Sequence, residues 1–183
     1  LAALKPEDLE SVDEFHVRGR KATLELAARM EITPGARVLD VGAGLGGPAR
    51  TVAAHHACHV TGVDLTADFC DAARTLSEWV GLSAQVDFRQ GDATALDVEP
   101  EGFDAAMSIH VAMNIARKDL VYAGVHRALK RDRIFAIYDI LQGEGGEVLY
   151  PVPWARDASI SSLATPADMR RLLTAANFAD RKS

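Results

Sequence analysis

The sequence has few cysteines and no long apolar run. Cys58 and Cys70 are its two cysteines, and no Cys-x-x-Cys pair occurs, so neither a disulfide framework nor a structural zinc site is indicated. No window approaches the ~18 apolar residues of a membrane span, and the acidic stretch LAALKPEDLE does not match a signal peptide. These absences predict a soluble chain in a reducing cytoplasm, without a membrane partner.

An excess of positive charge is also missing. Lys and Arg number 20 against 26 Asp and Glu, and the formal net charge is −6 at pH 7. A protein whose affinity came mainly from neutralising phosphates would carry the opposite balance, and no basic or aromatic stripe is apparent. Nucleic acid is therefore not an expected partner. Since repeats and charge blocks are absent too, residues 1–183 are expected to form a single domain.

What the sequence does contain is an alternation of short apolar runs and helical stretches. The alternation is the βαβ rhythm of an α/β protein with an open, mainly parallel, doubly wound Rossmann-like sheet and helices on both faces. Residues 1–32 are expected to form an N-terminal helical cap, with one or two helices over 6–31, and Thr165 is expected to cap a last helix. Strands are expected at 37–41, 59–65, 84–92, 103–110 and 133–140, and helices from about Pro48, at 67–80 and at 118–130.

A long loop precedes the last helix. Residues 141–164, LQGEGGEVLYPVPWARDASISSLA, contain glycines and prolines but also Tyr150 and Trp154. Loops of this length are usually functional or disordered, and the aromatic residues favour a lid over a substrate. Their faces suit a cationic amine through cation–π contact, with packing of the lid itself as the alternative.

The most specific motif is VLDVGAGLGGPAR at residues 38–50, in which Gly42 to Gly47 fit the dinucleotide pattern GxGxxG. A glycine-rich turn after the first strand lets a cofactor approach the backbone, and the following helix N-terminus favours negative charge. Asp64, about 20 residues on, stands where an acid that binds the ribose is expected. A nicotinamide dinucleotide and another adenosine-bearing cofactor both fit these features, and a tight turn without a ligand is the remaining alternative.

Two further acids separate these alternatives. Asp40 stands two residues before Gly42, where a dinucleotide-binding strand normally has apolar residues, and Asp92 follows the third strand, well placed for an adenine amino group. A Tyr-x-x-x-Lys pair, typical of reductases on this scaffold, is absent. The pattern therefore favours a cofactor other than a nicotinamide.

With these residues the chain resembles the class I S-adenosylmethionine-dependent methyltransferases, whose Asp/Glu-x-Gly-x-Gly-x-Gly motif matches Asp40, Gly42, Gly44 and Gly46. The segments DEFHVRGRKAT, GLGGPAR and YPVPWA look like the small-molecule branch that includes sarcosine/dimethylglycine-type N-methyltransferases. The resemblance implies S-adenosyl-L-methionine as the cofactor. It implies cofactor contacts at Asp40, Gly42, Ala43, Gly44, Gly46, Asp64, Leu65, Asp92, Ala93 and His110.

Candidate residues for chemistry and substrate binding gather at the expected ligand edge of the sheet. His110 and Asn114 follow the fourth strand and Asp139 ends the fifth, at the carboxyl edge where open α/β sheets bind ligands. His16 lies in the cap and is either a base, a cofactor contact or an ordinary packing residue. The predicted catalytic residues are His110, His16 and Asp139, and the predicted substrate-binding residues are Asn114, Tyr150 and Trp154. The crowded HHACH at 55–59 lies far from this edge, and no metal site is predicted.

The expected reaction is in-line transfer of a methyl group to a small-molecule acceptor, an amine before a hydroxyl or a carbon, with the rate coming mainly from positioning. A non-catalytic protein that binds an adenosyl cofactor as a scaffold is the main alternative, because fold does not imply function. An NAD(P)-binding oxidoreductase is a weaker alternative.

The sequence departs from the family at two places. The turn before the fifth strand reads LKRDR at 129–133 instead of Leu-Lys-Pro-Gly-Gly, so we expect an altered or mobile turn. The sequence ends at ANFADRKS, where the family adds an antiparallel strand pair. Either the sequence is truncated before that pair, or strand five is left as an unusual edge. If it is truncated, we expect low stability or a homodimer through that edge.

Overall fold

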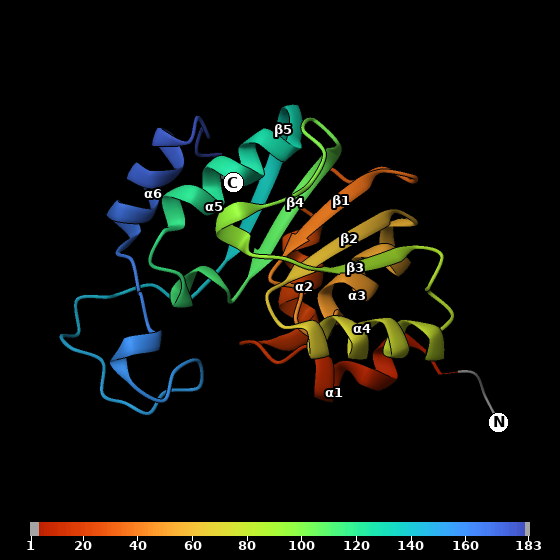
Figure 1. The fold of residues 1–183 in the computed structure, drawn as a ribbon, viewed down its shortest axis with the longest axis horizontal. Coiled ribbons are helices and arrows are strands. Elements are labelled where there is room, and N and C mark those ends of the chain that lie inside the picture. Colours follow the sequence, from red (N-terminus) through yellow and green to blue (C-terminus); the bar gives the residue numbers. More distant parts are fainter. Residues whose placement is uncertain (1–3, 182–183) are drawn as a thin grey trace.

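A computed structural model describes residues 4–181, which are built around one five-stranded sheet (Figure 1). All neighbouring strands are parallel, in the order β3-β2-β1-β4-β5. The strands are β1 (Arg37–Val41), β2 (His59–Asp64), β3 (Val86–Gln90), β4 (Phe103–Ile109) and β5 (Leu129–Tyr138). The prediction of an open parallel α/β sheet is confirmed.

Helices cover both faces of the sheet. The face that carries Val38 and Met107 packs against α2, α3 and α4, and the face that carries Leu39 packs against α5 and α6 (Figure 1). The central strand β1 is apolar on both sides because both faces are covered. The helices are α1 (Glu10–Asp13), α2 (Gly19–Ala27), α3 (Gly47–His56), α4 (Ala67–Trp79), α5 (Lys118–Ala128) and α6 (Pro166–Ala175), with 3₁₀ turns η1 (Pro6–Leu9), η2 (Ala93–Ala95), η3 (Ala112–Asn114) and η4 (Ala158–Ile160).

The strand order reverses between β1 and β4, and this reversal opens a crevice at the carboxyl ends of the strands. Gly42, which directly follows β1, has a φ of +80°, and a Cβ there would lie 2.3 Å from the Val111 side chain that follows β4. Only glycine fits this close approach. The glycine loop is therefore held directly beside the residues that follow β4.

The boundary between α5 and β5 corrects the sequence prediction. The expected helix 118–130 ends at Ala128, and the strand expected from 133 begins at Leu129, so the expected turn at 129–133 is part of β5. Asp132 takes a left-handed φ of 58°, and the pairing with β4 shifts register between Phe103 and Ala105. Asp104 on β4 pairs with Lys130 at 2.7 Å. Pairing across strands thus extends β5 through a charged segment that shows no apolar alternation.

Smaller differences concern the element ends. Asp139 follows β5 instead of ending it, and β3 stops at Gln90, so Asp92 lies in the loop and caps η2. The helical cap at 6–31 is divided into η1, α1 and α2. Thr165 caps α6 as predicted, because its hydroxyl accepts the amide of Asp168.

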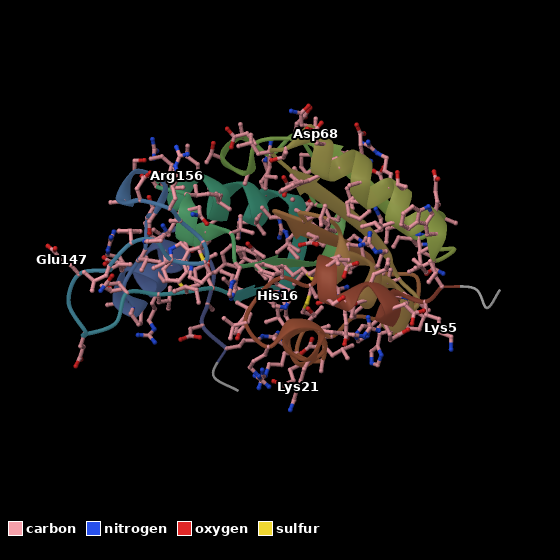
Figure 2. The ribbon with its side chains drawn as sticks, turned by 90° about the horizontal axis from the view of Figure 1, so that it is seen from below. Lys5, His16, Lys21, Asp68, Glu147 and Arg156 are labelled. Atoms are coloured by element: carbon pink, nitrogen blue, oxygen red, sulfur yellow. The ribbon has the colours of Figure 1, made fainter. Side chains whose placement is uncertain are left out.

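The loop 141–164 lies at one end of the molecule, where Figure 2 labels Glu147 and Arg156. Apart from η4 and a single bridge between Val152 and Ala155, it has no regular structure. Its two ends meet, since the amide of Gln142 donates to the carbonyl of Ala164 at 2.9 Å. Within residues 4–181, no helix is long and apolar enough to span a bilayer.

Candidate cofactor and acceptor site

The glycine loop between β1 and α3 is held by the end of β2. The amides of Gly42 and Ala43 donate to the carbonyl of Val63, and the amide of Gly44 donates to Oδ2 of Asp64 at 2.8 Å. A Cβ at Gly44 would meet nothing within 4 Å. The loop is therefore fixed on its protein side and open at Gly44, which leaves room for a ligand to approach the backbone.

Asp64 ends β2 and Asp92 follows the neighbouring strand β3, at the same edge of the sheet. Each oxygen of the half-buried Asp64 accepts a backbone amide, from Gly44 and from Thr66, and the carboxylate still has free lone pairs. Asp92 accepts the amide and the hydroxyl of Thr94, and these hydrogen bonds hold its pKa below the usual value. Both acids can accept further hydrogen bonds from the hydroxyl or amino groups of a ligand. Beside them lie Leu65, which is exposed, and Ala93, which is half-buried.

Asp40 is the most unusual acid of the site. It is 1% exposed, and its Oδ2 atom is buried without a hydrogen-bond partner among the described residues. Burial, with a further contribution from the negative charges of Asp64 and Glu14, raises the pKa of its carboxyl to about 8. A buried carboxyl without a partner is costly. A cationic ligand group at the crevice would remove that cost.

Two histidines and a tyrosine from three separate segments meet beside the crevice. His110 follows β4 with a left-handed φ of 55°, and its ring centroid lies 5.3 Å from that of Tyr138 and 5.8 Å from that of His16. Nε2 of His110 is buried without a partner within residues 4–181. Burial lowers the pKa of both imidazoles. The pair is therefore neutral at pH 7 and able to accept a proton.

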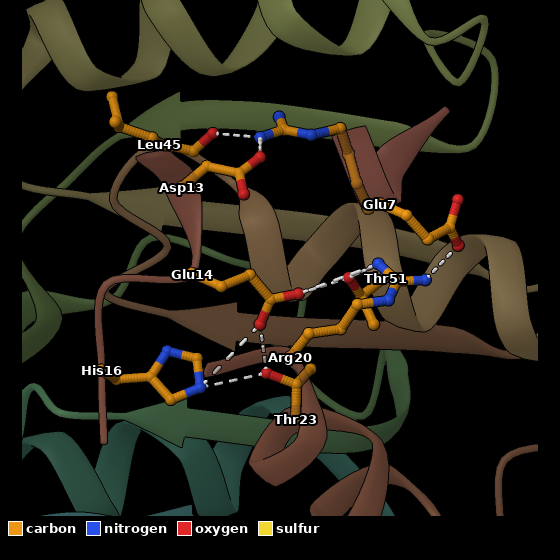
Figure 3. A network of polar contacts seen from close by, with 9 residues as sticks. Glu7, Asp13, Glu14, His16, Arg20, Thr23, Leu45 and Thr51 are labelled. Carbon is orange, nitrogen blue, oxygen red and sulfur yellow. Dashed lines mark hydrogen bonds and ion pairs between the residues drawn. The ribbon is translucent and has the colours of Figure 1, made fainter. Parts of the chain in front are cut away.

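A buried ion pair joins the N-terminal cap to the glycine loop (Figure 3). Nη2 of Arg50 on α3 donates to Oδ2 of Asp13 and to the carbonyl of Leu45 in the glycine loop, both at 2.6 Å. The side chain of Arg50 is fully buried, and its Nη1 also donates to Ala73 and Ser77 on α4. The charge of Arg50 is thus compensated by several partners, as a buried ion pair requires.

Asn114 and Asp139 hydrogen-bond to the protein itself. The amide of Asn114 donates to the carbonyls of Trp154 (3.0 Å) and Ile160 (2.6 Å), which pins the long loop to η3. The carboxylate of Asp139 accepts the amides of Met113 (3.1 Å) and Ile140 (3.0 Å). Burial raises its pKa to about 6, against the opposing effect of these bonds and of the Lys118 charge. Both residues therefore shape the edge where the loop is attached.

The structure thus brings the predicted cofactor residues and both histidines to one edge of the sheet. Tyr150 and Trp154 belong to the attached loop and are half-buried, and the indole of Trp154 donates to Ser161 at 3.2 Å. The rings of His55 and His56 lie 4.9 Å apart. Among residues 4–181, no group of three or more His, Cys, Asp or Glu could hold a metal ion.

Several residues of the site were not singled out from the sequence: Asp13, Glu14, Thr23, Arg50 and Tyr138. Four of them lie inside segments already marked by the resemblance, DEFHVRGRKAT and GLGGPAR, but nothing in the sequence of these segments shows that the side chains are buried. Tyr138 immediately precedes Asp139. Because successive strand residues point to opposite faces of the sheet, the sequence would have shown only that Tyr138 and Asp139 face opposite sides.

Comparison with protein families assigns the chain. A family model described as "Methyltransferase domain" matches residues 38–132, from β1 into β5. The chain belongs to this family, that of the class I S-adenosylmethionine-dependent methyltransferases. The family match decides between the cofactor classes that the glycine loop left open, and it confirms the prediction of an adenosyl-sulfonium cofactor.

Curated relatives include sterol 24-C-methyltransferases. The protein of Gibberella zeae is 36% identical over 116 residues, which cover 63% of this chain and 30% of the relative. The protein of Eremothecium gossypii is 33% identical over 153 residues, which cover 73% of this chain and 41% of the relative. The chain therefore spans less than half the length of these relatives.

Solved structures share the fold. The [4+2]-cyclase SpnF superposes with a TM-score of 0.76 at 29% identity, over 86% of this chain and 57% of that one. A putative sarcosine dimethylglycine methyltransferase from Galdieria sulphuraria superposes with a TM-score of 0.70 at 18% identity, over 86% of this chain and 58% of that one. The second likeness supports the fold alone.

The raised pKa of Asp40 predicts a pH-dependent stability. Asp40 keeps its proton in the folded protein up to about pH 8, whereas in the unfolded chain it ionises near 3.8, so its contribution to stability falls as the pH rises between these values. The Asp40→Asn variant has no such titration. The free energy of unfolding of Asp40→Asn minus that of wild type, measured with urea, should therefore increase from pH 5 to pH 8. One pKa unit corresponds to ~1.4 kcal/mol, so the increase should amount to several kcal/mol.

The exposed Asp97→Asn variant is the control and should show no pH-dependent difference. An Asp40→Asn difference that is equal at pH 5 and pH 8 would contradict the assignment of a protonated buried carboxyl.

Proposed function

We propose that the chain transfers a methyl group from S-adenosyl-L-methionine to a small-molecule acceptor by in-line displacement. The observation that carries the proposal is the buried Asp40 carboxyl, whose Oδ2 has no partner within residues 4–181 and which lies beside a glycine loop that is open at Gly44. S-adenosylmethionine carries an adenosine, which the acids can bind, and positive charge, which Asp40 can balance. The residues present therefore fit this cofactor.

Each cofactor-binding residue then has a role that its geometry permits. The backbone of Gly42, Ala43, Gly44 and Gly46 forms the floor of the site. The free lone pairs of Asp64 accept the ribose hydroxyls, and Asp92 accepts the adenine amino group. Leu65 and Ala93 pack against the adenine ring, and His110 lies on the reacting side.

When bound, the cofactor supplies an electrophilic methyl group, and the remaining catalysis falls to the chain's own residues. The loop and the cap fix the cofactor, so the rate comes mainly from alignment in a site that excludes water. The neutral imidazoles of His16 and His110 can take the proton that an acceptor releases. Asp139 acts through η3, whose amide it holds.

The acceptor is enclosed by two segments in this proposal. Residues 1–32 form the cap and residues 141–164 form the lid of one methyltransferase domain, 1–183. Tyr150 and Trp154 offer their faces to the acceptor, and Asn114 keeps the lid attached through its two hydrogen bonds to the loop. Because these residues suit a cationic amine, an amine is the acceptor we expect from the sequence.

A carbon acceptor is the second candidate, and the curated relatives favour it. Both sterol methyltransferases compared above are named for methylation at carbon. SpnF is a [4+2]-cyclase, so this fold also serves other chemistry. An activity assay must therefore be able to distinguish methyl transfer from cofactor binding without transfer.

The chain's cysteines are consistent with the reducing cytoplasm that we propose as its location. Cys58 and Cys70 are both free and 1% exposed. Burial raises the pKa of Cys58 to about 11, so its thiol is unreactive at neutral pH.

Replacement of Asp64 tests cofactor binding. In calorimetry, wild type should bind S-adenosylmethionine and S-adenosylhomocysteine and not NADH. Asp64→Ala should weaken adenosyl binding by about 10-fold to 100-fold, since it removes a charge-assisted acceptor worth about 1.5–3 kcal/mol. The exposed Asp97→Ala variant should bind as wild type does.

Binding of NADH alone would overturn the cofactor assignment. Tight adenosyl binding without methyl transfer, over a panel of small amines and sterol-like alkenes, would favour the scaffold over the methyltransferase.

The free edge of β5 is the basis for a proposed homodimer. Within residues 4–181, β5 pairs only with β4, so the backbone groups along its other edge can pair with a second copy. The exposed charges of Lys130, Arg131 and Arg133 oppose pairing in the first half, so the contact should form along Ile134–Tyr138. Light scattering should then show a mass that rises with concentration. A monomer at every concentration, with a cooperative melt, would contradict the dimer.

A further inference from the structure

Glu14 is a buried acid whose two oxygens are both engaged by hydroxyl groups. The side chain is 1% exposed. Oε2 accepts the hydroxyl of Thr23 on α2 and Oε1 accepts the hydroxyl of Thr51 on α3, both at 2.5 Å. Figure 3 shows that Nε2 of His16 faces the same two residues, 3.2 Å from Oγ1 of Thr23 and 3.8 Å from Oε2 of Glu14.

The number of hydrogens in this network determines which ring nitrogen of His16 carries the hydrogen. A threonine hydroxyl has one hydrogen, and Thr23 gives it to the carboxylate. The oxygen of Thr23 can therefore only accept from Nε2 of His16, so Nε2 carries the ring hydrogen. In a neutral imidazole the lone pair then lies on Nδ1. The reverse arrangement would leave Oε2 of the buried Glu14 without its hydrogen bond, which is costly.

The same histidine lies beside the proposed reaction site. Its ring lies 5.8 Å from that of His110 and 6.3 Å from that of Tyr138. Besides these rings, the charged group that faces it is Glu14, which is itself 4.0 Å from the guanidinium of Arg20. Burial lowers the pKa of His16, while the Glu14 charge and a hydrogen bond with the backbone of Gly19 oppose that effect. His16 is thus neutral when free and gains a stabilising carboxylate when it is protonated.

We propose that Glu14 and Thr23 are positioning residues that hold His16 in its Nε2–H tautomer, so that Nδ1 accepts the proton of the acceptor. The role of His16 as a base rests on the proposed methyl transfer, whereas its tautomer rests only on the hydrogen bonds to Thr23 and Glu14. The acceptor's electron pair forms the bond to the methyl carbon, and the sulfur–carbon bond breaks with its pair remaining on sulfur. The methylated cation then gives its proton to Nδ1, and the imidazolium, paired with Glu14, releases it to water.

The tautomer is tested directly by long-range ¹H–¹⁵N NMR on protein labelled with ¹⁵N-histidine. In wild type, His16 should be protonated at Nε2. Thr23→Val, which removes the hydroxyl at similar volume, should shift His16 to a mixture of tautomers, and Thr23→Ser should restore the wild-type spectrum. Thr75→Val, at an exposed hydroxyl that bonds to the Asp71 carbonyl, is the matched control. A wild-type His16 protonated at Nδ1, or a spectrum unchanged by Thr23→Val, would overturn the proposal.

Kinetics test the base role with the same variants. Thr23→Val and Glu14→Gln should lower kcat by roughly 10-fold or more, a part of the 10²–10⁴ that a positioned base supplies, with the KM for the cofactor unchanged. Thr23→Ser should recover most of kcat. Binding of S-adenosylhomocysteine with wild-type affinity shows that each variant is folded. Equal kcat in wild type and Thr23→Val would refute the base role. Absence of methyl transfer in wild type would refute the proposed function, while the NMR result would still decide the positioning of His16.

Discussion

The fully buried guanidinium of Arg50 is the interaction on which the site depends. It joins the end of α1, the glycine loop and α4 through Asp13, Leu45, Ala73 and Ser77. The end of α1 lies directly against Gly47, the first residue of α3 after the glycine loop. A Cβ on Gly47 would lie 2.3 Å from the carbonyl oxygen of Asp13, so no side chain fits there. Removal of either charged partner would leave the other buried and alone, at a cost of about 3–5 kcal/mol. The cap and the cofactor loop therefore behave as one unit.

Adjacent residues of the cap serve opposite sides of the proposed site. Asp13 holds the glycine loop through Arg50, and Glu14 holds His16 through Thr23. A short stretch of backbone thus sets the distance between the cofactor loop and the imidazole pair. In-line transfer needs the methyl group, the acceptor and the base within a few tenths of an ångström of their places. Rigid attachment of loop and base to the same short segment meets that need.

The sequence predicted those features that depend on local pattern. Short apolar runs located β1, β2 and β4, and the positions of Asp40, Asp64 and Asp92 near the carboxyl ends of three strands indicated an edge that binds an adenosyl group. Contacts between distant residues were not predictable in this way, because Asp13 and Arg50 are 37 positions apart and nothing in either segment shows that they are buried. The start of β5 was missed because its first residues are charged and are held by Asp104 on β4. The sequence did not show that the side-chain amide of Asn114, predicted to bind substrate, donates to two carbonyls of the loop 141–164.

We infer that Asp40 is protonated in the free protein and ionises to balance a cationic cofactor. Calorimetric titration with S-adenosylmethionine at pH 7, in two buffers of different ionisation enthalpy, measures the protons released on binding. With a pKa of about 8 for the carboxyl in the free protein, wild type should release about one proton and Asp40→Asn none. Binding without proton release in wild type, or equal release in both proteins, would contradict it.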